Sequence, residues 1–211
     1  MRNFLKPIFV MAALAITMTF AATSAKADIV TFTSTGIFTS SGATAGSGTS
    51  AITFGTDGNQ TTLTFADGAN SIFLNPGQSS VVNFGTIGIT TTGTGAALSG
   101  TLSINIMQTS PTGGNGSLVG TLSGTISQIP APGSSTGQIV FTVSTVTIGA
   151  VTYNVQSPVL LPAPGTGSTT TVQGTAALSA VPEPATMVLL GTGLMGVGAT
   201  VRRRRKASQE A

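Results

Sequence analysis

The chain has 211 residues, only 6% of them charged, and it contains no Cys and no His. These absences exclude a disulfide-linked scaffold and catalysis by a thiol or an imidazole. The formal net charge of +3 includes eight Lys and Arg residues, all of which lie before residue 27 or after residue 201. Because the cations are confined to the two ends, the sequence excludes the basic surface with which folded domains bind nucleic acid.

The first 27 residues have the three parts of a secretory signal peptide. Arg2 and Lys6 give a positive start, residues 8–22 are mostly apolar, and Ala25-Lys26-Ala27 provides the small-x-small pattern of a cleavage site. The alternatives are an N-terminal membrane anchor and a buried helix, but the apolar run is shorter than the ~20 residues of a typical span, and the cleavage pattern follows it at the expected distance. We therefore predict export, with cleavage after Ala27 and a mature chain that begins at Asp28.

Residues 28–181 are predicted to form one Thr-, Ser- and Gly-rich domain that is all-β, a single antiparallel β-sandwich-like unit. Apolar and polar residues alternate at 102–106, 118–126 and 139–143, which is typical of half-buried strands. Shorter runs of the same type, together with a last strand, are expected at residues 29–35, 52–54, 61–65, 71–74, 81–84, 87–91 and 171–178. Turn signals between these runs favour an antiparallel arrangement, and residues 158–170 are expected to form a long loop.

The acids of this domain are Asp28, Asp57 and Asp67, and it has no basic side chain. Asp57 and Asp67 could form a carboxylate pair for glycoside hydrolysis or could bind calcium. Each stands directly before a glycine, however, and Asp-Gly is a frequent turn sequence. We favour turns over both sites, so we predict no catalytic residue, no metal site, no cofactor and a non-enzymatic protein.

The aromatic residues of the domain are expected in its core. Carbohydrate-binding faces often use exposed aromatic rings, and this domain has one Tyr, Tyr153, and seven Phe in mostly apolar positions. A less favoured alternative is a water-ordering, ice-binding face, because Thr31, Thr33 and Thr35 have the two-residue spacing of one strand face, as do Thr145 and Thr147. Such a face would require a regular array of Thr over several strands.

The C-terminal segment combines three features in a fixed order. Val181-Pro182-Glu183-Pro184 precedes the apolar stretch 185–201, which is followed by Arg202, Arg203, Arg204, Arg205 and Lys206. The prolines keep the chain extended, and the apolar stretch is long enough for a transmembrane helix of roughly 25 Å. By the positive-inside rule, residues 202–206 would remain on the cytoplasmic side and stop export.

This arrangement resembles the PEP-CTERM sorting signal of Gram-negative bacteria, which is also classified as an ice-binding protein C-terminal domain. The resemblance covers residues 182–206 and fits the signal peptide at the other end. It implies that a membrane protease-transpeptidase, exosortase, transiently binds Pro182, Glu183 and Pro184 and processes the tail. The protein would pass through an inner-membrane intermediate to the cell surface or the extracellular space.

The association of this family with exopolysaccharide-producing bacteria implies a structural or adhesive role in a biofilm matrix, with extracellular polysaccharide as a partner. A carbohydrate- or surface-binding module is the alternative function. Removal of both ends would also remove every Lys and Arg. We therefore expect an acidic mature protein, with an isoelectric point on the order of 4.

Overall fold

The computed structural model describes residues 27–128, 135–163, 168–180 and 191–196. Residues Ala27–Ser179 belong to one compact unit. The described residues of this unit form eleven strands, β1 (Asp28–Thr39), β2 (Ala51–Thr56), β3 (Asn59–Leu74), β4 (Ser79–Thr92), β5 (Ala96–Ser110), β6 (Gly114–Ile126), β7 (Gln138–Val143), β8 (Thr145–Ile148), β9 (Val151–Val155), β10 (Val159–Leu160) and β11 (Ser168–Leu178).

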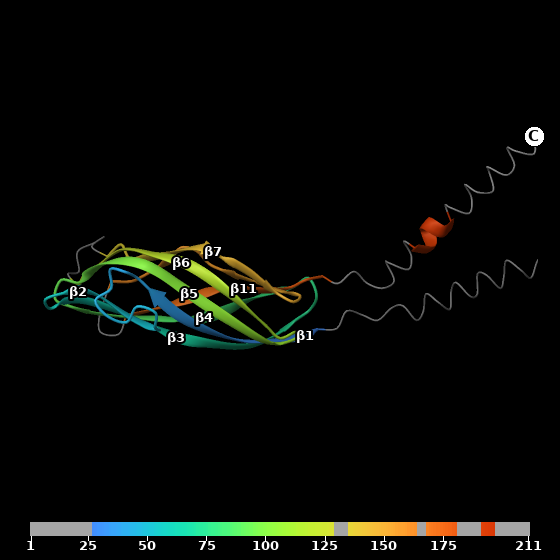
Figure 1. Ribbon diagram of the computed structural model, residues 1–211. Helices are drawn as coiled ribbons and strands as arrows, with labels where there is room; N and C mark the ends of the chain where they lie inside the picture. The colour runs from blue at the N-terminus through green and yellow to red at the C-terminus, as the bar shows by residue number, and fades with distance from the viewer. Residues whose placement is uncertain (1–26, 129–134, 164–167, 181–190, 197–211) are drawn as a thin grey trace, which may run out of the picture. The chain divides into compact units, whose positions relative to one another are not determined.

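Neighbouring strands pair in the order β10-β7-β6-β5-β1-β3-β4-β11-β9-β8, and β2 pairs with β3 beside this path. All of these pairings are antiparallel. The predicted all-β, antiparallel class is therefore confirmed. Figure 1 shows the strand path curled so that its two halves face one another.

Strand β3 belongs to both halves. Residues 60–67 pair with β4, whereas residues 68–74 pair with β1, so the change occurs between Asp67 and Gly68. We call β1, β5, β6, β7, β10 and the second part of β3 the first layer. The second layer consists of β2, β4, β8, β9, β11 and the first part of β3.

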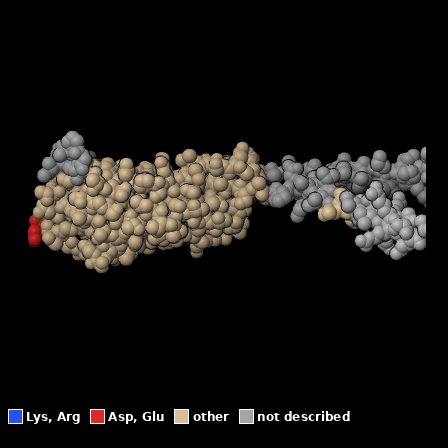
Figure 2. All heavy atoms as spheres, turned by 90° about the horizontal axis from the view of Figure 1, so that it is seen from above, with Lys and Arg blue, Asp and Glu red and all other residues tan. Residues whose placement is uncertain are grey.

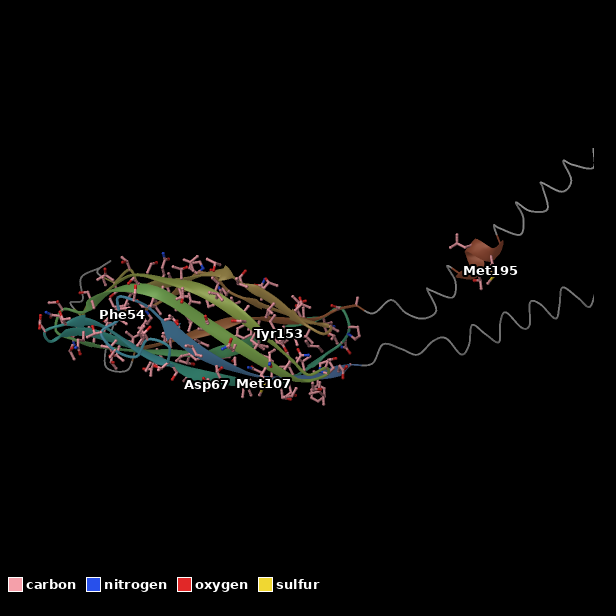
Figure 3. The ribbon with its side chains drawn as sticks, viewed as in Figure 1. Phe54, Asp67, Met107, Tyr153 and Met195 are labelled. Atoms are coloured by element: carbon pink, nitrogen blue, oxygen red, sulfur yellow. The ribbon has the colours of Figure 1, made fainter. Side chains whose placement is uncertain are left out.

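The core lies between the two layers and is built by alternate side chains of each strand. In β1, for example, Val30, Phe32 and Phe38 are buried, while the Thr residues between them point outward. The rings of Phe32, Phe84 and Tyr153 pack together, with the centroid of Phe32 5.9 Å from that of Phe84 and 4.8 Å from that of Tyr153. Figure 3 shows Tyr153 between the layers. These rings join strands β1, β4 and β9 across the core.

A buried polar link accompanies the rings. The hydroxyl of Tyr153 donates a 2.7 Å hydrogen bond to Oε1 of Gln108 on β5. Nε2 of Gln108 donates in turn to the carbonyls of Thr112 (2.7 Å) and Ile148 (3.4 Å). Both side chains are fully buried, so each of these bonds satisfies a group that would otherwise be costly to remove from water.

The first and last strands of the domain meet at one end, which we call the basal end. Asp28 of β1 pairs with Leu74, and the turn after Leu74 hydrogen-bonds to Leu178 at the end of β11. The backbone N–H of Gly77 donates to the carbonyl of Leu178, and that of Leu178 donates to Gln78. The chain therefore enters and leaves the domain beside the β3–β4 turn.

Most of the predicted alternation is confirmed by burial. Leu102, Ile104 and Ile106 are at most 1% exposed, and the inward phase of residues 118–126 includes Gly120 as expected. The predicted Asp57-Gly58 turn is confirmed, since both residues have positive φ.

Several local predictions are wrong. The separate strands expected at 61–65 and 71–74 form one strand, β3, and those expected at 81–84 and 87–91 form β4. The Asp67-Gly68 pair is not a turn, because both residues lie inside β3 where that strand changes layers. The expected loop at 158–170 contains the short strand β10 and the start of β11. Phe73 is not in the core, since 75% of its surface is exposed, whereas the other six Phe residues of the domain are buried.

Gly36 provides a test of the packing between the layers. The ring of Phe65 lies where a β-carbon on Gly36 would stand, so the substitution Gly36→Ala forces buried groups apart. We expect it to lower the free energy of unfolding by about 1–3 kcal/mol, as overpacked cores do. Gly88→Ala is the matched control, because its new methyl group meets only Oγ1 and the carbonyl oxygen of Thr64, at 3.6 and 3.9 Å. Urea unfolding of both variants measures the difference, and equal stabilities would contradict the packing described.

Tyr153→Phe tests the buried polar link. Loss of the hydroxyl leaves Oε1 of Gln108 unpaired, so we expect the free energy of unfolding at neutral pH to fall by about 1–3 kcal/mol. Burial also raises the pKa of the Tyr153 hydroxyl above its ordinary value of 10.0. The folded protein thus keeps a proton that the unfolded chain releases above that pH.

The stability that depends on this proton is fully present below pH 10.0 and declines as the pH rises beyond it. Unfolding curves of the parent protein should therefore show this alkaline decline, and those of Tyr153→Phe should lack it. An identical alkaline decline in both proteins would show that Tyr153 is not its source.

Candidate functional site

A shallow hollow of about 550 Å³ lies on the outer side of the first layer, over β1, β5 and β6. Its position follows from the strand periodicity, since the residues between the buried positions must face outward. Met107 is 53% exposed there, and Figure 3 shows it at the outside of the sheet. The hollow is lined by Thr33, Thr35, Asn105, Ile106, Met107, Asn115, Gly116 and Ser117.

Six outward side chains of this hollow form two rows across the three strands. The register places Thr33 opposite Met107, and Met107 opposite Asn115. In the second row, Thr35 lies opposite Asn105, and Asn105 lies opposite Ser117. The array measures roughly 10 Å across the three strands, from the spacing between strands, and roughly 7 Å along them, from the rise over two residues. We call these six side chains the outer grid.

The polar side chains of the outer grid are free to bind a ligand. Thr33, Thr35, Asn105, Asn115 and Ser117 are all polar, and no side-chain hydrogen bond within the described residues engages any of them. Elsewhere on the domain some neighbouring outward side chains bond to one another, as Thr53 does to Thr62 at 2.9 Å and Thr147 to Thr152 at 3.1 Å. The outer grid therefore presents unused donors and acceptors.

The outer grid is also uncharged. Of the acids of the described domain, Asp28 lies at the basal end and Asp57 in the β2–β3 turn, whereas Asp67 follows the Gly68–Ser34 pair and so stands on the strand beside Thr35 at the edge of the grid. Figure 2 shows one face of the described domain as a surface of uncharged residues with an acidic group at one end. Such a surface suits a neutral ligand, because it offers no counter-charge to an ion.

The carboxylate pair considered from the sequence does not form. Asp57 and Asp67 are exposed and stand ten positions apart along an extended segment, which corresponds to roughly 30 Å. The two carboxyl groups of a glycosidase must flank one bond and lie within about 10 Å. Among the described residues there is likewise no group of three or more acidic, His or Cys side chains that could hold a metal ion.

The Thr array of the ice-binding alternative does not extend from β1 to its neighbours. Thr33 and Thr35 are exposed as expected, but β5 places Met107 and Asn105 beside them. On the other side, β3 places Ser71 beside Thr31, and their hydroxyls bond to each other at 3.3 Å. The surface around Thr33 and Thr35 therefore combines amide, thioether and hydroxyl groups. Such a mixture is typical of a ligand-binding surface, whereas an ice-binding face would repeat one type of side chain at regular spacing.

The sorting residues predicted from the sequence fall mostly outside the described part of the chain. This applies to Ala25, to Pro182, Glu183 and Pro184, and to the basic tail from Arg202 to Lys206. Ala27 is described and is exposed. Residues 191–196 form a short helix, on which Leu194 and Met195 are 66% and 72% exposed. In the described part of the chain, no helix has the length and apolar character required to span a bilayer.

The outer grid could not be identified from the sequence. The two grid positions on β1 lie about 70 residues before those on β5, which lie about 10 residues before those on β6. Within its own segment, each pair resembles the ordinary outward-facing polar residues of a strand. One signal was present, because Asn is disfavoured in strands, yet Asn105 lies within the strand-like run 102–106 and Asn115 lies shortly before the run 118–126. Only the β1-β5-β6 pairing shows that they share a surface.

Comparison with known proteins identifies the C-terminal segment. Residues 180–205 match the family model of the PEP-CTERM protein-sorting motif, which includes Pro182, Glu183 and Pro184 and the arginines that follow the apolar stretch. No curated protein and no solved structure matches the chain. The family model accounts for the order of tripeptide, apolar stretch and basic end that the sequence displays. The chain is therefore an exported protein with a PEP-CTERM motif, a substrate for sorting by exosortase.

Proposed function

We propose that this protein is a non-enzymatic adhesive component of the cell surface or extracellular matrix, and that it binds uncharged polysaccharide through the outer grid. The observation that carries the proposal is the array of five unpaired polar side chains around Met107 on three adjacent strands. Hydroxyl and amide groups bind the hydroxyls of sugars as both donors and acceptors. The exposed thioether of Met107 offers an apolar contact for the C–H face of a sugar ring.

The composition of the grid supports binding rather than catalysis. Thr33, Thr35 and Ser117 supply hydroxyl groups, but a hydroxyl requires a neighbouring base to become a nucleophile. The chain has no His, and the outer grid itself contains no acidic side chain. We infer that the protein holds its ligand without transforming it.

Binding to a single sugar chain would be weak, since the grid is shallow and lacks an aromatic stacking platform. Many copies on one surface would still hold a polymer firmly, because linked sites bind at high effective concentration. A repeating neutral polysaccharide provides such linked ligands. This arrangement suits an adhesive or matrix role.

Delivery to that location would depend on both ends of the chain. We propose that the signal peptide is removed after Ala27 and that residues 185–201 hold the precursor in the inner membrane, with residues 202–206 on the cytoplasmic side. The helical residues 191–196 and the exposed Leu194 and Met195 are consistent with an apolar membrane segment. Exosortase then releases the domain to the surface.

A matched pair of variants tests the outer grid. Thr35→Val removes one hydroxyl from the grid, while Thr171→Val makes the same change at an exposed position on the outer side of the second layer. We expect Thr35→Val to weaken binding to a neutral polysaccharide by about 2- to 10-fold, the value of one hydrogen bond. Affinity electrophoresis in gels containing a neutral glucan or an anionic alginate gives the measurement.

Thr171→Val should migrate as the parent protein does, and alginate should retard none of the proteins. The proposed site would be contradicted if the neutral glucan retarded both variants equally, or if the anionic alginate retarded the proteins more than the neutral glucan does. Circular dichroism of each variant verifies that the fold is retained.

Replacement of Pro182, Glu183 and Pro184 by Ala tests the sorting motif. Because the family model places these residues in the recognised segment, we expect the variant to accumulate as a membrane-bound precursor that keeps residues 202–206. Fractionation of the native host, followed by intact-mass analysis, distinguishes precursor from product. Replacement of Gln209, Glu210 and Ala211 by Gly is the control, since these positions lie beyond the matched residues. Normal release of the triple-Ala variant would contradict a role for the motif.

A further inference from the structure

The basal end carries exposed apolar side chains. Phe73 is 75% exposed, and its direct partner across the β1–β3 pair, Ile29, is 41% exposed. Val81, two positions after the start of β4, is 68% exposed. Phe73 and Val81 flank the turn of residues 75–78, so all three side chains belong to the same end of the domain.

The membrane-directed tail leaves the domain from this same end. The N–H of Ser179 donates to the carbonyl of Ala150, and among the described residues this is the last backbone bond along the chain that ties it to the domain. Both the N–H and the carbonyl of Leu178 form hydrogen bonds with the backbone of the turn of residues 75–78. The apolar stretch begins at Ala185, only six residues after Ser179. Even a fully extended chain spans about 20 Å over that distance.

We propose that the basal end rests in the interfacial region of the lipid bilayer, with Phe73 inserted, while the precursor is held by its tail. This inference rests on the membrane-anchored intermediate of the proposed function. Because the segment between Ser179 and Ala185 is short, the basal end must lie close to the lipid in whatever direction this segment runs. Phe and aliphatic side chains gain free energy in the headgroup and upper acyl region, because they leave water there.

The charge at the basal end is compatible with that position. Asp28 is the acid that the structure places there, and it is exposed at the start of β1. A single carboxylate at the edge can remain in the hydrated headgroup layer while Phe73 and Ile29 extend toward the acyl chains. The contact would end when exosortase cleaves the tail, so it holds the Pro182-Glu183-Pro184 segment at the membrane only before processing.

The chain contains no Trp, so one introduced indole reports on a single position. The test uses the exported precursor with its tail intact, reconstituted into phosphatidylcholine vesicles that carry bromine near the headgroup end of the acyl chain. Phe73→Trp is the reporter. Leu160→Trp is the matched control, because Leu160 is 67% exposed and lies at the other end of the domain, roughly 30 Å or more from the basal end.

We expect the indole at position 73 to emit at shorter wavelength than the indole at position 160, and to be quenched several-fold more strongly by the brominated lipid. Co-sedimentation with the vesicles is measured first, since a precursor that stays in solution would contradict the anchored intermediate itself. If the precursor is bound but both indoles are quenched equally, the lipid contact is wrong. A blue-shifted, unquenched indole at position 73 would mean that protein covers it, which also overturns the proposal.

Discussion

Where β3 passes from one layer to the other, the hydroxyl of Ser34 on β1 donates a 2.6 Å hydrogen bond to the carbonyl of Phe84 on β4. Ser34 is fully buried, so this bond satisfies two polar groups inside the core and ties the first layer to the second. Gly68 permits the crossing, because a β-carbon there would lie 2.7 Å from the Ser34 hydroxyl and 2.8 Å from the carbonyl of Asn83. Since β3 is one of the two central strands of the path and pairs in both layers, the relative position of the layers depends on this junction.

Hydroxyl groups, rather than charged side chains, make the surface of the domain hydrophilic. A third of the residues in 28–181 are Ser or Thr, and the structure places most of the apolar residues between the layers. Some outward hydroxyls of the second layer bond to one another, as Thr53 and Thr62 do. The polar groups of the outer grid are unpaired. A neutral surface with open hydrogen-bonding capacity is suited to a neutral, hydroxyl-rich polymer.

The position of the basal end connects the fold with the sorting pathway. The domain begins and ends beside the β3–β4 turn, so its long axis extends away from the point of attachment. A tail-held precursor would therefore keep Phe73 near the lipid, while the outer grid lies further along the same layer. The short segment between Ser179 and Pro182 also limits how far the sorting motif can be from the domain. Folding and membrane attachment are thus compatible in one precursor.

The sequence by itself determined the all-β class, several strand positions and the sorting tail, because each depends on local patterns. Alternation at 102–106 is an intrinsic property of one strand, and the order of Pro-Glu-Pro, apolar stretch and basic end is read along one segment. The tertiary structure determined the features that depend on which strands pair with one another. Asp67-Gly68 has the local chemistry of a turn, yet pairing with Gly85 and Ser34 keeps it within β3. Ile72, Phe73 and Leu74 form a continuous apolar run, and only the register shows that Phe73 faces outward. The outer grid, likewise, exists only because β1, β5 and β6 become neighbours, which no local pattern specifies.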